Sequence, residues 1–477
     1  MVDVPHILQA HRGHVIAPAG CGKTELIAKT IAQSEGKPVL VLTHTTAGVA
    51  ALRQRLQRDG VSASNYRLNT IAGWALTIIS MFPERAGYLH DPKNAPDYTA
   101  VQNAVGELCA SGAIHSEIAA TYSRVLVDEY QDCSASQHLI TSGLASAIPA
   151  IVFGDPMQAI FGFGNDPLPD WTTQVVPTFP ELGRLNTPWR WNNAGANDLG
   201  GWLLTVRGAL EAGHQIDLRT LPDRVAWHPL CADHNANAVA QIAVQYEIAK
   251  ANPQETILII GDSIQADSRH NFASRAKGVG VVEPVDFRDV VDFANQMDGK
   301  SGQELLVAVI GFLISVMTNV YGEKLNARVQ SILGGRNRTP PTAPEVAAVS
   351  LVQGGGYAEA VNFLKAMAGD RTRRVYRQNA FNIMIEALQI AIAKQDGNLP
   401  AAIAGIREQR RHAGRVIPPK AIGSTLLLKG LEADHVVILD ADRPGNAMSK
   451  EHLYVALTRG ARSVSVFSRS PILPKRS

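Results

Sequence analysis

The stretch that decides the fold is APAGCGKT at residues 17–24, which follows the apolar run HVI and opens the helical run TELIAKTIA. Gly20 and Gly22 permit backbone conformations in which successive N–H groups turn inward around an oxyanion. The N-terminus of the following helix adds the positive end of its dipole. The Lys23 ammonium can reach phosphate oxygens, and the Thr24 hydroxyl is a ligand suited to Mg²⁺. The segment therefore predicts a phosphate-binding loop between a strand and a helix.

The loop departs from the usual pattern at one position, since Ala17 stands where the first glycine is expected. A GKT tripeptide also occurs by chance in turns, so the strand before it and the helix after it are needed for the assignment. The loop residues expected to contact a nucleotide are Ala17, Pro18, Ala19, Gly20, Cys21, Gly22, Lys23 and Thr24.

Strand-like and helix-like runs alternate after the loop. PVLVLTHT at 38–45 is a continuous apolar run, and AGVAALRQRLQRDG at 47–60 is helical and closes at Gly60. SRVLVDEYQD at 123–132 and PAIVFGDPMQ at 149–158 have the composition of buried strands. Strands that alternate with helices at this spacing are typical of a parallel α/β sheet.

The character of the chain changes between about residues 286 and 415, where alanine-rich amphipathic stretches replace the strand-like runs. A Pro-rich break, RNRTPPTAPE at 336–345, divides this region. Strand-like sequence returns in STLLLKGLEADHVVILDAD at 424–442 and in SVSVFS at 463–468. This order indicates a helical block inserted between two α/β segments.

The fold class predicted is therefore α/β, with two parallel-sheet cores, a phosphate-binding loop in the first and a helical insertion in the second. A chain of 477 residues is long enough for several domains. We assign residues 1–190 to the first core with a short accessory insertion at about 76–120, residues 191–283 and 416–477 to the second core, and residues 284–415 to the helical insertion.

Composition limits the possible classes of protein. Charged residues make up 18% of the chain and the formal net charge is +2, so a nucleic-acid site must be a local groove and not the whole surface. The four cysteines have no metal-binding spacing, which favours reduced thiols. The apolar run ELLVAVIGFLISVM at 304–317 is too short for a membrane span and predicts a buried helix. The N-terminal stretch has no signal-like apolar run, so we expect a soluble cytoplasmic protein.

A second motif, RVLVDEYQD at 124–132, places two acids at the end of an apolar strand. Asp128 is predicted to hold Mg²⁺, and Glu129 is predicted to polarise the attacking water as the general base. An acidic, solvated turn after a strand is a common alternative. The position about a hundred residues after a phosphate-binding loop favours the catalytic interpretation and predicts ATP and Mg²⁺ as cofactors.

The chain resembles superfamily 1 helicases of the UvrD/Rep/PcrA type, whose DExQD signature DEYQD matches. The resemblance implies that both parallel-sheet cores are RecA-like P-loop NTPase cores. Other motifs of that family follow in its order. They are LTHTTAGVAALRQRL (42–56), VFGDPMQAIFGF (152–163), LNTPWRW (185–191), STLLLKGLEADHV (424–436) and LYVALTRGAR (453–462).

The resemblance assigns further roles in the nucleotide site. Gln158 is expected to link the γ-phosphate to the rest of the motor. Arg190 and Arg459 match the two arginines that bring positive charge to the γ-phosphate from the second core. Trp189 takes the place of the tyrosine that stacks on adenine, and Glu432 that of an acid near the ribose. Gln9 is a candidate for reading adenine, although a surface glutamine is an equal alternative.

The resemblance also implies a single-stranded DNA track. Phe163 matches the aromatic residue that stacks on a base, and Thr43, His44 and Thr70 lie where the family contacts phosphates. The alternatives are a core position for Phe163 and a helix-capping role for the threonines.

Three departures from the family concern coupling and unwinding. Gly164 replaces an arginine and Leu426 replaces a histidine, and the segment between Trp74 and Tyr122 is short where larger relatives carry an accessory domain. The helical region also carries two basic runs, RTRRVYR (371–377) and REQRRHAGR (407–415), which could contact duplex DNA or a partner, or could be solvated helix faces.

Two functions of different classes follow. The first is an ATP-dependent DNA helicase or translocase with 3′–5′ polarity. The second is a DNA- or nucleotide-sensing ATPase subunit that regulates a partner nuclease, because compact UvrD-like proteins of this size occur beside OLD-type nucleases in the Gabija anti-phage system. A neighbouring nuclease gene would favour the second function.

Overall fold

The computed structural model describes residues 2–89, 96–162, 164, 166–284, 287–394, 397–412 and 417–475, without the side chains of residues 408 and 410–412. The chain divides into two compact units. The first consists of Met1–His228 and Ala441–Ser477, and the second of Pro229–Asp440. This division into two units does not test the assignment of two cores and a helical insertion made from the sequence. That assignment stays a prediction.

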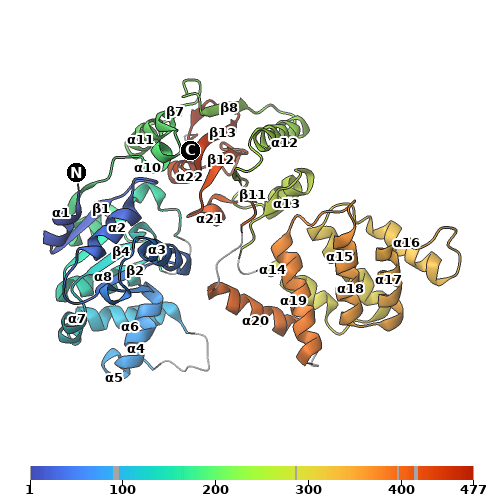
Figure 1. The fold of residues 1–477 in the computed structure, drawn as a ribbon, viewed down its shortest axis with the longest axis horizontal. Coiled ribbons are helices and arrows are strands. Elements are labelled where there is room, and N and C mark those ends of the chain that lie inside the picture. Colours follow the sequence, from blue (N-terminus) through green and yellow to red (C-terminus); the bar gives the residue numbers. More distant parts are fainter. Residues whose placement is uncertain are drawn as a thin grey trace. The chain divides into compact units, whose positions relative to one another are not determined.

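The first sheet has six strands in the order β3-β2-β4-β5-β1-β6, and all of its pairings are parallel. Figure 1 labels three of these strands, β1, β2 and β4. Its strands are β1 (Arg12–Ile16), β2 (Val39–Thr43), β3 (Tyr66–Thr70), β4 (Val125–Asp128), β5 (Ala150–Gly154) and β6 (Glu181–Arg184).

Both faces of this sheet are covered by helices, which explains why its strands read as continuous apolar runs. In β2, for example, Val39 and Val41 pack with α2 and α3, whereas Leu40 and Leu42 pack with α4. The helices of this unit are α1 (Val4–Gln9), α2 (Lys23–Ala32), α3 (Thr46–Arg58), α4 (Ile71–Met81), α5 (Pro83–Ala86), α6 (Tyr98–Ala110), α7 (His115–Thr121), α8 (Ala135–Ala147), α9 (Val176–Thr178), α10 (Trp189–Asn193), α11 (Asn197–Glu211) and α22 (Lys450–Leu457).

Short helical turns connect several of these elements and carry parts of the motifs. They are η1 (Ala63–Asn65), η2 (Tyr130–Asp132), η3 (Pro156–Gln158) and η4 (Trp171–Val175). A small antiparallel pair joins β7 (Ile216–Asp217) to β14 (Ile472–Leu473).

The second sheet also has six strands, in the order β10-β11-β9-β12-β13-β8. The pairings β10–β11, β11–β9 and β9–β12 are parallel. The strands are β8 (Val225–Pro229), β9 (Ile257–Ile260), β10 (Gly280–Val281), β11 (Lys420–Gly423), β12 (Ala433–Ile438) and β13 (Gly460–Ser468), and nearby helices are α12 (His234–Ala251), α13 (Ala266–Arg275) and α21 (Thr425–Leu428).

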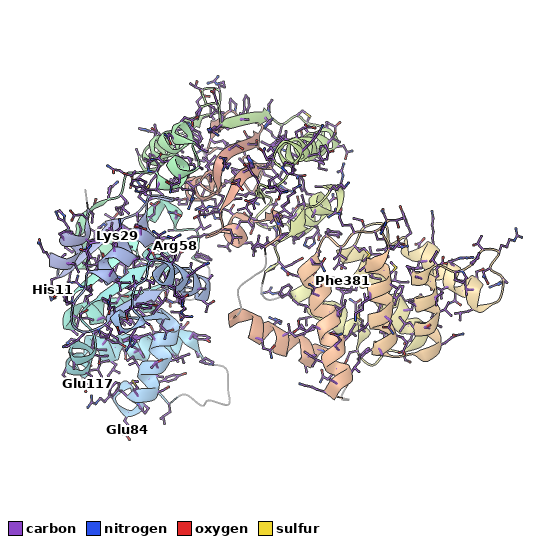
Figure 2. All side chains as sticks on the ribbon, viewed as in Figure 1. His11, Lys29, Arg58, Glu84, Glu117 and Phe381 are labelled. Atoms are coloured by element: carbon purple, nitrogen blue, oxygen red, sulfur yellow. The ribbon has the colours of Figure 1, made fainter. Side chains whose placement is uncertain are left out.

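A helical block lies between β10 and β11 in the sequence and has its own apolar core. Phe381 of α19, labelled in Figure 2, belongs to that core. The helices are α14 (Arg288–Met297), α15 (Gly302–Val316), α16 (Gly322–Leu333), α17 (Ala343–Gly354), α18 (Tyr357–Gly369), α19 (Gln378–Lys394) and α20 (Leu399–His412).

The fold class predicted from the sequence is confirmed: two parallel-sheet cores of the RecA-like type, with a helical insertion within the second. The apolar run at 304–317 forms α15, which is buried along most of its length, although Val307 and Ile314 remain more than half exposed. Among the described helices, none is long and apolar enough to cross a membrane.

Candidate nucleotide site at the edge of the first sheet

The phosphate-binding loop leaves β1 and enters α2, as the sequence predicts. Gly20 and Gly22 have φ angles of 67° and 89°, in the left-handed region that favours glycine. A Cβ atom at Gly20 would lie 2.8 Å from Cβ of Arg190. Gly22 caps α2 without a side-chain hydrogen bond, so no capping side chain occupies the N–H groups of the first helical turn. The local geometry is that of a loop able to bind an anion.

The Lys23 ammonium contacts both carboxylates that follow β4. Its Nζ lies 2.8 Å from Oδ1 of Asp128 and also pairs with Oε1 of Glu129. Burial alone would lower the pKa of Lys23, but the two acidic neighbours raise it above its ordinary value. Burial raises the pKa of Asp128, and the ammonium opposes that rise. We assign the pair as ammonium and carboxylate, because an ion pair at this distance is stronger than the neutral hydrogen bond that would replace it.

Glu129 adopts a left-handed backbone conformation with φ of 54°, which is uncommon for a residue with a side chain. Its N–H donates to Oδ1 of Asp128 at 2.9 Å. The conformation turns the chain directly after β4, so that two successive acids both face Lys23. Such local strain is typical of functional sites.

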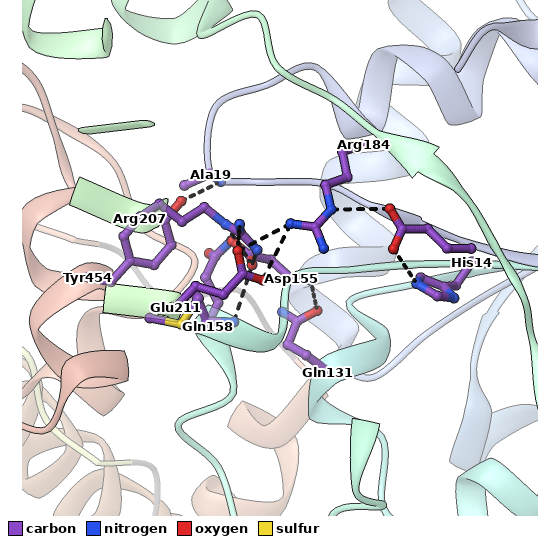
Figure 3. Close-up of polar contacts among 11 residues, drawn as sticks. His14, Ala19, Gln131, Asp155, Gln158, Arg184, Arg207, Glu211 and Tyr454 are labelled. Carbon is purple, nitrogen blue, oxygen red and sulfur yellow. Dashed lines mark hydrogen bonds and ion pairs between the residues drawn. The ribbon is translucent and has the colours of Figure 1, made fainter. Parts of the chain in front are cut away.

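Gln131 bridges the ends of β4 and β5 and was missed by the sequence-based assignment. Its Nε2 donates to Oε2 of Glu129 at 2.5 Å, and its Oε1 accepts a hydrogen bond from the N–H of Asp155 at 3.1 Å (Figure 3). The side chain is buried. The fourth letter of DEYQD carried this signal, but nothing in the sequence shows which groups the amide joins.

Gln158 lies in η3, directly after β5. Its Nε2 donates to Oδ2 of Asp155 at 3.0 Å. The opposite oxygen of Asp155 accepts from Arg207, which the sequence-based assignment also missed. The LLTVRGALE text around Arg207 reads as an ordinary amphipathic helix, so the sequence gave no signal for this contact.

Arg190 and Trp189 lie directly against the phosphate-binding loop. The backbone N–H of Arg190 donates to the carbonyl of Gly20 at 3.1 Å. A Cβ atom at Gly22 would lie 3.0 Å from Cδ1 of Trp189, so the indole borders the loop. That indole is 53% exposed, which leaves a large aromatic face free for stacking.

The helix α22 and the predicted Arg459 that follows it belong to the same unit as the loop. The Tyr454 hydroxyl accepts a hydrogen bond from the N–H of Ala19 at 3.3 Å (Figure 3). Arg459 follows α22 and is buried, and its guanidinium donates to the carbonyl of Val455 at 2.9 Å and to Oγ1 of Thr458 at 3.0 Å. The Arg190 guanidinium donates to the carbonyl of Thr458 at 2.7 Å. Both predicted arginine fingers therefore contact the C-terminal end of α22.

Two other residues are predicted to contact the nucleotide, Gln9 and Glu432. Gln9 is the last residue of α1 and is exposed. Glu432 is also exposed and belongs to the second unit, directly before β12. Their roles at adenine and ribose stay predictions.

The predicted DNA contacts lie near the carboxyl ends of neighbouring strands. Thr43 pairs in register with both Thr70 and Asp128. Thr43 is fully buried and its Oγ1 has no hydrogen-bond partner in the structure, so direct contact with a phosphate requires a local opening. The Oγ1 atom of Thr70 accepts a hydrogen bond from the N–H of Gly73 at 2.9 Å and so caps α4. This is the helix-capping role that the sequence offered as the alternative to a DNA contact.

Of the other two residues predicted to contact DNA, the structure describes His44 but not Phe163. The His44 ring lies 5.9 Å from the Phe161 ring, and its Nδ1 lies 3.2 Å from Oε1 of Gln137. Phe163 lies outside the described residues, so its stacking role stays a prediction.

Two arginines of the basic run at 371–377 make contacts inside the second unit, whereas Arg371 is exposed. Arg377 is 2% exposed and pairs with Glu283 at 2.6 Å and with Asp289 at 2.5 Å. Arg374 donates to the carbonyls of Val279 and Ala273 at 3.0 Å and 2.6 Å. These two arginines fasten the helical block to β10 and α13 within the second unit. Of the second basic run at 407–415, most side chains lie outside the described residues.

Replacing Arg377 with methionine is expected to destabilise the protein by about 3–5 kcal/mol, because it leaves the buried Glu283 carboxylate without its partner. The measurement is the urea midpoint of unfolding, and Arg371→Met is the matched control, since Arg371 is exposed in the same run. Equal midpoints for the two variants would contradict a fastening role for Arg377.

A magnesium site of the kind predicted fits the residues present. Among the described residues there is no group of three or more His, Cys, Asp or Glu that could hold a metal ion by itself. Mg²⁺ in nucleotide sites needs fewer protein ligands, because phosphates and waters complete its octahedron. Thr24 follows Lys23 in the first turn of α2. Because the Lys23 ammonium contacts Asp128, the Thr24 hydroxyl and the Asp128 carboxylate both lie near the loop.

The fold and the site together define a P-loop NTPase built on parallel sheets. Within this class, residues 91–166 match the family model of the UvrD/REP helicase N-terminal domain. That match includes DEYQD and VFGDPMQAIFGF, and it confirms the resemblance to UvrD/Rep-type helicases that the motifs suggested. No curated protein matches the sequence.

Two solved structures of Arterivirus nonstructural protein 10 (helicase) are similar to this chain. The complex of that helicase with DNA has 7% sequence identity to this chain and a TM-score of 0.37. The other crystal structure of the helicase has 9% sequence identity and a TM-score of 0.32. Each match covers 97% of this chain, which spans only 62% and 61% of those helicases. The family model and these structures name no nuclease and no anti-phage system.

Proposed function

We propose that the protein is an ATP-dependent DNA helicase or translocase of the UvrD type, which moves 3′–5′ along single-stranded DNA. The observation that carries the proposal is the convergence of Lys23 on Asp128 and Glu129, with 2.8 Å between Lys23 and Asp128. A phosphate-binding lysine, a metal-binding acid and a general base are the groups that nucleoside triphosphate hydrolysis requires. The family match at residues 91–166 supports the helicase class.

The nucleotide site assigns a task to each side chain. Lys23 and the loop N–H groups hold the phosphates, and the exposed Trp189 face stacks on the base. Thr24 and Asp128 hold Mg²⁺, which when bound neutralises charge on the phosphates. Glu129 orients the attacking water and accepts its proton.

The direct test is ATP hydrolysis by the purified protein, measured with and without a single-stranded oligonucleotide and with excess EDTA. The expected result is magnesium-dependent hydrolysis that single strands stimulate. Hydrolysis that DNA does not change would favour the alternative, a sensing subunit that regulates a partner nuclease. Strand displacement from substrates with a 3′ or a 5′ tail then tests the polarity.

Single strands are expected to bind more tightly than blunt duplex, and binding is expected to weaken as salt rises, because phosphate contacts release counterions. Removing the predicted base-stacking side chain by Phe163→Ala should cost about 1–3 kcal/mol of binding free energy. Fluorescence anisotropy with an oligonucleotide and its duplex measures both effects. Tyr321→Ala is the control, because Tyr321 is a 63% exposed aromatic residue of the helical block. Equal affinity for both DNA forms, unchanged by Phe163→Ala, would contradict the proposed track.

A further inference from the structure

The carboxylate of Asp155, at the end of β5, is shared between two side chains. Its Oδ1 accepts hydrogen bonds from Nε and Nη2 of Arg207 at 3.2 Å and 2.7 Å. Its Oδ2 accepts from Nε2 of Gln158 at 3.0 Å. Figure 3 shows the three side chains close together, with dashed lines for the contacts among them. The orientation of the amide therefore depends on how the carboxylate is held.

Arg207 is itself fixed from a second side. It projects from α11, is 4% exposed, and donates through Nη1 to Oε2 of Glu211 at 2.9 Å. Glu211 is also bonded to Arg184, with 3.2 Å between Oε2 and Nη1 (Figure 3). The planar guanidinium fork contacts one carboxylate with two nitrogens and the other with the third, so it holds both in one geometry.

Arg207 is also close to the loop side of the site. Tyr454, whose hydroxyl accepts from the N–H of Ala19, is buried, and Arg207 and Asp155 both act electrostatically on it. Burial raises the pKa of Tyr454, so the phenol is neutral and its oxygen can accept this hydrogen bond. Arg207 of α11 thus interacts with Asp155, which directly precedes η3, and with Tyr454 of α22, whose hydroxyl contacts the loop.

We propose that Arg207 is the positioning residue for Gln158, so that α11 holds the amide where a γ-phosphate is expected and senses its loss. The inference rests on the proposed ATP hydrolysis. Without the guanidinium, Asp155 loses both hydrogen bonds from Arg207 and keeps those from the N–H of Met157 and from Nε2 of Gln158. The carboxylate, and with it the Gln158 amide, is then held less closely. Lys23, the loop and Trp189 are not part of the contacts from Arg207 through Asp155 to Gln158. A variant without the guanidinium is therefore expected to keep binding nucleotide.

The expected kinetic signature is a loss in kcat with little change in KM for ATP, since the amide acts on the reacting phosphate and not on the bound nucleotide as a whole. Arg207→Gln should lower kcat about tenfold or more and change KM less than about twofold. Arg207→Lys keeps the charge but not the fork, and should fall between wild type and Arg207→Gln.

A double-mutant cycle separates positioning from a general structural role. In the Gln158→Ala background, Arg207→Gln is expected to cause less than about a twofold further loss in kcat, because residues that act as a unit are not additive. The matched control is Arg219→Gln, since Arg219 pairs with Asp217 but is 62% exposed in its side chain. That control should keep wild-type kcat.

The results that would overturn the inference are equally specific. If Arg207→Gln keeps wild-type kcat, or loses the same factor with and without Gln158, Arg207 does not act through the amide. If Arg207→Gln fails to fold, the same cycle is run with Arg207→Lys, and additive losses there count against the inference. An inactive wild-type protein would overturn the proposed function and the inference together, whereas an active wild type with additive losses would overturn the inference alone.

Discussion

Glu129→Gln is expected to bind ATP with nearly wild-type affinity and to hydrolyse it roughly 10²–10⁴ times more slowly. The substitution keeps the size of the side chain and the turn after β4, but an amide cannot accept the proton of the attacking water. Glu129 is held in place by the Nε2 of Gln131 at 2.5 Å and by its own N–H on Asp128 at 2.9 Å. The N–H contact with Asp128 is unchanged by the substitution, and the one oxygen that the amide retains can accept from Gln131 or from Lys23.

Two measurements isolate this effect. Binding of a fluorescent ATP analogue reports affinity, and phosphate release reports turnover. Lys23→Ala is the contrasting variant and should lose binding, because it removes the ammonium that is expected to hold the phosphates. Glu117→Gln is the matched control, since Glu117, labelled in Figure 2, lies on α7 and pairs with Arg85 at 2.7 Å. Unchanged turnover in Glu129→Gln would remove Glu129 as the base.

The sequence was sufficient for the fold class and for the loop because both depend on local patterns. VLVLT is apolar at every position, and the structure buries all five residues as β2 between two layers of helices. Gly20 and Gly22 lie in the left-handed conformations that the loop pattern requires. Asp128 and Glu129 follow their strand and meet Lys23 because parallel strands end at one edge of a sheet.

What the sequence could not predict are contacts between distant residues and the depth of each side chain. Arg207 reaches Asp155 across 52 residues of sequence, and no local pattern shows this. Arg374 and Arg377 occur in a run that looks cationic and exposed, yet their charges are used inside the second unit. Thr43 occupies the strand end expected for a DNA contact, but the structure buries it completely. Burial is decided by which helix covers the strand end, here α3 near Gly48.

Arg190→Ala and Arg459→Ala are each expected to lower kcat by roughly 10³ or more, if the two guanidinium groups bring positive charge to the transferring phosphate. The structure gives each arginine a second task, because both donate to the C-terminal end of α22. Lost hydrogen bonds of this kind cost about 0.5–1.5 kcal/mol each and lower the melting temperature by a few degrees. Stability and catalysis therefore have to be measured on the same variants.

Lysine substitutions distinguish these two tasks. Arg190→Lys and Arg459→Lys keep one donor for the carbonyl groups of α22 but lose the fork that can contact a phosphate with two nitrogens. A catalytic finger predicts that each lysine variant keeps most of the melting temperature and still loses most of kcat. A purely structural arginine predicts that kcat recovers together with the melting temperature. The backbone N–H of Arg190 donates to the carbonyl of Gly20 at 3.1 Å, and a lysine at this position keeps that hydrogen bond. We therefore expect Arg190→Lys to show the clearer difference between the loss of kcat and the change in melting temperature.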